Sequence, residues 1–204
     1  MDNLSFDGKN NQQLSSLPGK AFEAVEYLIF YDDKSFASKP NLMNIDITAI
    51  EIKQIGANEV ELLTKYRMAY LTELQGEQSS EYQINLCKEL NAFFEKALAE
   101  QRFFAFMALY KGEVISFGAM VVKKIPGDFN KPFYLEGDIL NMYTIPSARR
   151  NGVSALILEK LIDEARNRGI SKISLHTTKE GEKLYRKFGF CEPIYPVLEL
   201  IPTI

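Results

Sequence analysis

Nine residues, Pro146 to Ser154, combine two arginines with a glycine where an apolar segment gives way to a helical pattern. Backbone amides at the start of a helix lack a partner within the helix, and the helix dipole adds partial positive charge there. Gly152 removes a side chain where a phosphate group must approach the backbone, and Arg149 and Arg150 add positive charge. The segment therefore predicts an anion-binding loop, without saying which anion.

The usual nucleotide-binding motifs do not occur in the chain. There is no G-x-x-x-x-G-K-[ST] sequence, which argues against a P-loop nucleotidase. There is also no G-x-G-x-x-G sequence after a strand, which argues against a Rossmann site.

A second segment, Gly181 to Phe190, has the pattern of a short amphipathic helix that Gly189 ends. Tyr185 lies in the middle of this helix. Taken alone, the pattern favours Tyr185 as a packing residue, and a chemical role stays an alternative.

Together the two segments resemble the GCN5-related N-acetyltransferase (GNAT) superfamily. In that family a strand ends in a proline-containing turn, an R/Q-x-x-G-x-G/A loop follows, and a later helix ends in L-Y-x-x-x-G-F. The matching residues here are Arg149–Ser154 and Leu184–Phe190. The match covers residues 139–190, and the order of elements extends it to about 47–201. The run from Leu175 to Gly181 resembles the small-molecule-type branch.

This sequence departs from the family pattern at three positions. Ser154 stands where the family usually has Gly or Ala, Gly181 replaces a common Ala, and Thr178 replaces a frequent Asn. A serine is small and can give its amide and hydroxyl to a phosphate, so we expect binding to survive.

The hydrophobic pattern predicts an α/β (α+β mixed-sheet) fold in the order β-α-α-β-β-β-α-β-α-β. Strands are expected at residues 47–55, 103–109, 114–122, 133–145, 171–177 and 194–201. A capping box at Asn58 and Glu61 should begin the first helix, and later helices are expected at 150–168 and 180–188. The resemblance implies that strands four and five splay apart.

The resemblance implies acetyl-CoA as co-substrate, with its pantetheine arm along the end of strand four. The amide of Tyr143 is the expected donor to the oxyanion. The residues expected to bind the coenzyme are Met142, Tyr143, Thr144, Arg149, Arg150, Asn151, Gly152, Val153, Ser154, Ala155 and Thr178.

The resemblance also implies direct acetyl transfer to a primary amine, with Tyr185 protonating the departing thiolate. The base that deprotonates the amine stays open among Glu136, His176 and Asp138. Each has a simpler alternative, because a strand carboxylate is often solvated and a histidine is often only hydrogen-bonded.

The acceptor also stays open. A small-molecule amine is the leading expectation, with a protein lysine or N-terminus, or a silent acetyl-CoA sensor, as alternatives. Glu73, Glu77 and Glu81 near the connection of the first two helices would attract a cationic amine, or form a solvated surface.

The composition of the chain limits its expected partners, metal sites and location. The 204-residue chain has a net charge of −3 and a pI near 5.4, which argues against nucleic acid as a partner. Cys87 and Cys191 suit reduced thiols, and with His176 as the only histidine no metal site is expected. Neither a signal peptide nor a membrane span is apparent, so a cytoplasmic protein is expected.

Residues 1–44 are expected to form a partly disordered extension, and residues 45–204 the acetyltransferase domain. Family members often form dimers. The resemblance therefore leaves a homodimer open, with the extension or the last strand as the contact.

Overall fold

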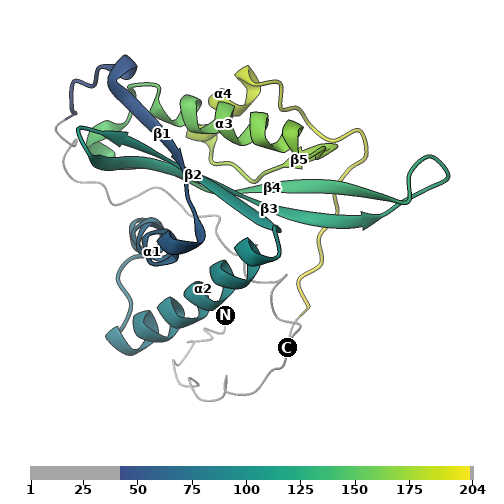
Figure 1. Cartoon of the computed structure of the whole chain (residues 1–204), viewed down its shortest axis with the longest axis horizontal. Helices are drawn as coiled ribbons and strands as arrows, with labels where there is room; N and C mark the ends of the chain where they lie inside the picture. The colour runs from purple at the N-terminus through teal and green to yellow at the C-terminus, as the bar shows by residue number, and fades with distance from the viewer. Residues whose placement is uncertain (1–41, 203–204) are drawn as a thin grey trace, which may run out of the picture. The chain divides into compact units, whose positions relative to one another are not determined.

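A five-stranded sheet in the order β1-β2-β3-β4-β5 underlies the fold (Figure 1). The computed structural model describes residues 42–202, so most of the predicted extension lies outside the described residues. Residues 42–191 belong to one compact unit and residues 192–202 to a second. The strands are β1 (Ile50–Gln54), β2 (Phe103–Tyr110), β3 (Glu113–Pro126), β4 (Phe133–Thr144) and β5 (Lys172–Ser174).

Helices cover both faces of this sheet. In Figure 1, α1 and α2 lie on one face and α3 and α4 on the other. The helices are α1 (Val60–Gln75), α2 (Ser80–Ala99), α3 (Val153–Asn167) and α4 (Lys179–Lys187). Two apolar clusters match these layers, one including Phe94 and Phe117 and the other including Ile157 and Tyr185.

Strand pairing confirms the predicted mixed sheet. β1 to β4 pair antiparallel, whereas β4 and β5 pair in parallel across α3. In the β2–β3 turn, Gly112 has a φ of 82°, a conformation that glycine adopts readily in tight hairpin turns. Gly169, at φ 71°, likewise follows the end of α3.

β4 contains a bulge near its carboxyl end. Tyr143 pairs with Phe117 and Leu140 with Ala119, so Asn141 and Met142 together lie opposite Gly118. Asn141 takes φ 56° and is buried. The extra residue inverts the side-chain alternation, so Tyr143 contacts the α1 side of the sheet whereas Met142 packs on the α3 side.

β4 and β5 pair over only three residues. The last pair is Asp138 with Ser174, and β4 then continues to Thr144 without β5 beside it. Strand β5 is therefore shorter than the predicted 171–177. Because the pairing ends here, the backbone of β4 after Asp138 has no neighbouring strand on this side among residues 42–202.

Three other predictions need correction. The helix expected from Arg150 begins at Val153, because positive φ angles at Arg150 (67°) and Gly152 (80°) are incompatible with a helix. The Asn58–Glu61 capping box does not form; instead the Glu59 carboxylate accepts a hydrogen bond from the amide of Gly56 at 3.0 Å.

The predicted last strand, residues 194–201, is also wrong. Residues 192–202 contain no strand, and their large apolar side chains are exposed. Pro193 and Pro196 lack the amide hydrogen that a strand ladder requires, which opposes pairing at these positions. None of the helices in residues 42–202 combines the length and apolar character needed to cross a bilayer.

Candidate active site

The loop before α3 presents a run of open backbone amides. Among residues 42–202, no acceptor contacts the five consecutive amides from Arg150 to Ser154. The next amide, that of Ala155, donates to the Gly152 carbonyl oxygen at 3.0 Å and so begins the helical bonding. Open amides at the start of a 15-residue helix suit the anion site that the sequence predicts, which stays a prediction, and the amide of Ala155 is already bonded within the helix.

Two polar side chains of this loop support the backbone. The side-chain amide of Asn151 donates to the carbonyl oxygens of Ala148 and Arg149, at 3.2 and 3.1 Å, and to that of Met43. Arg149 donates through Nε to the Thr144 carbonyl oxygen at 2.9 Å. These hydrogen bonds hold the loop backbone in place. The guanidinium group of Arg149, expected to face the anion, is instead bonded to the end of β4.

The end of β4 alternates between two hydrogen-bonding directions. The Tyr143 carbonyl oxygen accepts from Ser116 Oγ at 2.8 Å, and the Ile145 amide donates to the Ile115 carbonyl oxygen at 3.0 Å. Both residues therefore face β3, whereas Met142 and Thr144 face the side where β5 has ended. The amide of Tyr143, which was expected to serve the oxyanion, is therefore directed toward β3. The amides of Met142 and Thr144 are directed to the opposite side, beyond the end of the β4–β5 pairing.

Tyr185 lies on α4 with only 8% of its surface exposed. Its ring packs edge-on against Phe190, with 5.8 Å between ring centroids. Gly181 lies one turn earlier, where an added Cβ would come within 2.7 Å of the Thr177 hydroxyl and 3.4 Å of the Tyr185 ring. The glycine that departs from the family pattern therefore leaves room for close packing beside Tyr185. The Thr178 hydroxyl accepts from the Gly181 amide at 3.3 Å and caps α4.

Two tyrosines of the site hold their protons more strongly than usual. Burial raises the pKa of Tyr185 to about 12, with a further contribution from nearby Tyr70. Burial also raises the pKa of Tyr143 to about 12, followed by its hydrogen bond to Glu73. Both phenols are therefore neutral hydrogen-bond donors at physiological pH.

Among the described residues, no recorded contact joins Tyr185 to any of the three candidate bases, Glu136, Asp138 and His176. Glu136 pairs with Lys172 at 2.9 Å, and Asp138 forms an ion pair with Lys123. Both carboxylates lie on β4 before the bulge, beside the paired part of the sheet. His176 is exposed after β5. The choice among these three residues stays open.

Sequence reasoning missed the contribution of α1. Glu73 was expected either to attract a cationic amine or to form a solvated surface, and neither alternative included its ion pair with Arg149 Nη2, at 2.5 Å. On the same helix, the ring of Tyr70 packs edge-on against Tyr143, with centroids 6.1 Å apart. The available signal was the three-residue spacing of Arg67, Tyr70 and Glu73, which places them on one helix face.

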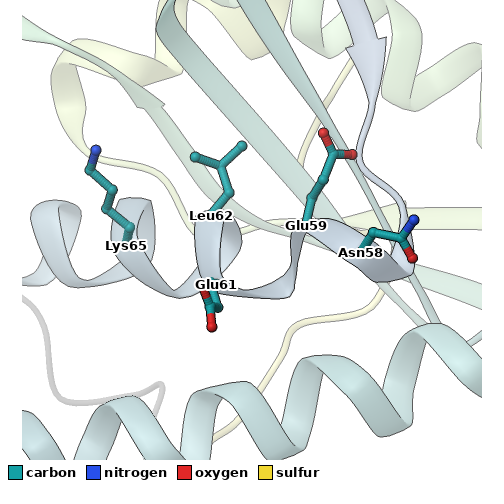
Figure 2. A pocket seen from close by; sticks show the side chains of 5 residues that line it. All are labelled: Asn58, Glu59, Glu61, Leu62 and Lys65. Carbon is teal, nitrogen blue, oxygen red and sulfur yellow. The ribbon is translucent and has the colours of Figure 1, made fainter.

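A hollow at the beginning of α1 does not belong to this site. It is lined by Asn58, Glu59, Glu61, Leu62 and Lys65 (Figure 2). Glu59 is engaged there, because it pairs with Lys53 at 2.5 Å and accepts from the amide of Gly56. The hollow lies on the first turns of α1, whereas the contacts to β4 come from later turns.

Open amides at the start of α3 lie after a strand, β4, whose pairing with β5 ends at Asp138, an arrangement typical of acyltransferases with a splayed sheet. The chain belongs to the Acetyltransferase (GNAT) family, whose model matches residues 64–190. This confirms the resemblance and the predicted fold.

Individual relatives agree at the level of the family. The uncharacterized N-acetyltransferase YsnE of Bacillus subtilis (strain 168) is 41% identical over 64 residues, which are 28% of this chain and 42% of that protein. The match thus spans less than half of that relative's length. A predicted acetyltransferase with acetyl-CoA from Clostridium acetobutylicum has 29% identity and a TM-score of 0.64, over 74% of this chain and 96% of that one.

A more distant structure shares the fold. The aminoglycoside acetyltransferase HMB0005 from an uncultured soil metagenomic sample is 20% identical, with a TM-score of 0.54 over 75% of this chain and 99% of that chain. At this identity the likeness concerns the fold alone.

The raised pKa of Tyr185 predicts a specific loss of stability in alkali. Between pH 10 and 12 the folded chain keeps a proton that the unfolded chain, with a phenol pKa of about 10, has released. The free energy of unfolding therefore falls as pH rises through this window, by up to about 1.4 kcal/mol per pH unit for this one group. Urea unfolding at pH 9, 10 and 11 should show a shallower decline for Tyr185→Phe than for the wild type. Equal declines would contradict the burial of the phenol.

Proposed function

We propose that the protein transfers the acetyl group of acetyl-CoA directly to the primary amine of a small molecule. The observation that carries the proposal is the run of open amides from Arg150 to Ser154 at the start of α3, which suits a pyrophosphate. Gly152 at φ 80° leaves the backbone accessible, and the exposed Arg150 adds positive charge. The Ser154 amide belongs to the same run, so the departure from the family pattern keeps the required donor.

The β4 backbone fits an extended amide-containing arm. Because Met142 and Thr144 face the gap beyond β5, their backbone groups offer hydrogen bonds two residues apart, as a neighbouring strand would require. One of these amides would stabilise the negative charge that develops on the carbonyl oxygen. This position replaces the amide of Tyr143, which faces β3.

When bound, acetyl-CoA supplies a thioester whose carbonyl carbon the acceptor nitrogen attacks. The new C–N bond forms as the C–S bond breaks, and the sulfur leaves with the electron pair of that bond. Tyr185, neutral at physiological pH, donates its proton or a hydrogen bond to the departing sulfur. The amine loses one proton to a base, for which Glu136, Asp138 and His176 are the candidates.

An amine panel tests the acceptor class. The full chain should release free thiol from acetyl-CoA with at least one small primary amine among polyamines, amino acids and aminoglycosides. Peptides with a lysine or a free N-terminus form the comparison set. Faster release with peptides would overturn the small-molecule acceptor. Coenzyme binding without release for any amine would favour a silent sensor.

The role of Tyr185 has its own test. With the best amine, Tyr185→Phe should lower kcat by roughly tenfold to a thousandfold, because the departing sulfur loses its proton donor. The KM for acetyl-CoA should change little, since the phenol acts on the leaving group rather than on the pyrophosphate. An unchanged kcat would reduce Tyr185 to a packing residue of the α4 side.

The proposed coenzyme loop can be tested with the two glycines that flank α3. Gly152→Ala forces a side chain into a left-handed conformation and toward Ile47 Cδ1, 3.2 Å from the added Cβ. We expect the Kd for coenzyme A, measured by calorimetry, to rise about tenfold as the amides lose their alignment.

Gly169→Ala is the matched control for this variant. Gly169 also has a positive φ, 71°, but it follows the other end of α3, and an added Cβ there meets nothing within 4 Å. Both variants carry similar backbone strain, yet only Gly152→Ala should weaken coenzyme binding. Equal weakening in the two would show that general destabilisation, rather than the loop, is responsible.

A further inference from the structure

One face of α1 carries three chemically unlike side chains at three-residue spacing, Arg67, Tyr70 and Glu73. Positions three apart on a helix lie on the same side, so these residues approach the sheet together. Arg67 Nη1 donates to Asn141 Oδ1 at the β4 bulge. The Tyr70 ring packs edge-on against Tyr143, one residue before the last of β4.

Of these three residues, Glu73 is the one that contacts Arg149 in the loop before α3. Its Oε1 lies 2.5 Å from Arg149 Nη2, and its carboxylate also accepts the hydrogen bond of the Tyr143 phenol. Arg149 donates through Nε to the Thr144 carbonyl oxygen and lies over the Tyr143 ring, 5.8 Å from its centroid. One guanidinium group thus joins α1, the end of β4 and the loop.

The geometry of this guanidinium group explains why a carboxylate is needed. Arginine presents its N–H groups in a planar fork, so fixing one edge on a carboxylate and another on a carbonyl sets the position of the whole group. Glu73 is 23% exposed and Arg149 39%, so the pair is partly shielded from solvent. Pairs of this exposure contribute little to overall stability.

We propose that Glu73, although it lies on α1, is a positioning residue for the coenzyme site and acts through Arg149 and Tyr143. By holding the Arg149 fork, Glu73 keeps the Thr144 carbonyl and the start of the loop in register with the Met142 and Thr144 amides. The proposal rests on the proposed binding of acetyl-CoA along β4 and over the loop.

Removing the charge of Glu73 should change the affinity for coenzyme A in opposite directions under the two explanations, positioning of the site and charge repulsion alone. Coenzyme A is a polyanion, so removing a nearby negative charge should tighten its binding if charge alone matters. If Glu73 positions the site, removing its charge should weaken binding instead. Glu73→Gln keeps the shape of the side chain and an acceptor for Tyr143, and it removes only the charge that holds Arg149.

The experiment measures the Kd for coenzyme A by calorimetry and the steady-state constants for acetyl-CoA. Glu73→Gln should raise both the Kd and the KM by about tenfold, with a melting temperature close to that of the wild type. Arg149→Gln should also weaken binding. The double variant should match Arg149→Gln alone, because the two residues act as one unit.

Glu61→Gln is the matched control. Glu61 is an exposed glutamate of the same helix, and Figure 2 shows its side chain directed away from those of Glu59, Leu62 and Lys65. This control carries the same charge change and should leave the Kd unchanged. Tyr143→Phe is a second probe, because it removes one donor to Glu73 without altering charge, and it should weaken binding by a smaller factor than Glu73→Gln.

Four outcomes are informative. Weakening confined to Glu73→Gln, Arg149→Gln and Tyr143→Phe supports the proposal. A Kd for Glu73→Gln equal to or below that of the wild type overturns it. Independent effects that multiply in the double variant also overturn it. A wild type that binds no coenzyme A contradicts the proposed function itself, which is a separate failure.

Discussion

The bulge in β4 is the constraint on which the rest of the site depends. Two residues, Asn141 and Met142, oppose Gly118, and this single insertion inverts the alternation of the strand. Met142 then packs toward α3, and Tyr143 turns toward α1, where Tyr70 and Glu73 meet it. A regular strand would place Tyr143 on the α3 side, away from those partners. The positive φ of Asn141 has a local cost, and the bond from Arg67 fixes the residue in place.

The same bulge separates two functions along one strand. Before it, β4 pairs with β5, and the carboxylates of Glu136 and Asp138 form ion pairs with lysines. After it, the β4 backbone has lost its neighbour on that side and runs into the loop at the start of α3. A strand that is structural in its first half and open in its second is what a binding site for an extended, amide-containing molecule requires.

Features that depend on neighbouring residues, such as turns and helix ends, could be predicted from the sequence. Contacts between segments far apart in the chain could not. The turn at Gly112, the end of α3 at Gly169 and the spacing between the loop and Tyr185 follow from neighbouring residues. The bond between Glu73 and Arg149 joins residues 76 positions apart, and no local pattern announces it. The failed strand at 194–201 is the converse case, since apolar residues suggested pairing and Pro196 opposed it. The position of the bulge is a further contact of this kind, because it depends on Gly118 across the sheet.

The two loop arginines differ in their surroundings, because Arg149 is bonded to other residues and Arg150 is exposed. This difference bears on how the proposed anion site could accept a serine at position 154. Arg149 is committed to Glu73 and Thr144, so its net charge near a phosphate is largely offset. In the proposed coenzyme site, affinity would then come mainly from the aligned amides of residues 150–154, with Arg150 as the added charge. Amide donors depend on backbone position rather than on side-chain type, which is why a serine at 154 can stand where the family prefers glycine or alanine. Interactions that hold the backbone, including those made from α1, are therefore more important for this site than the identity of most of its side chains.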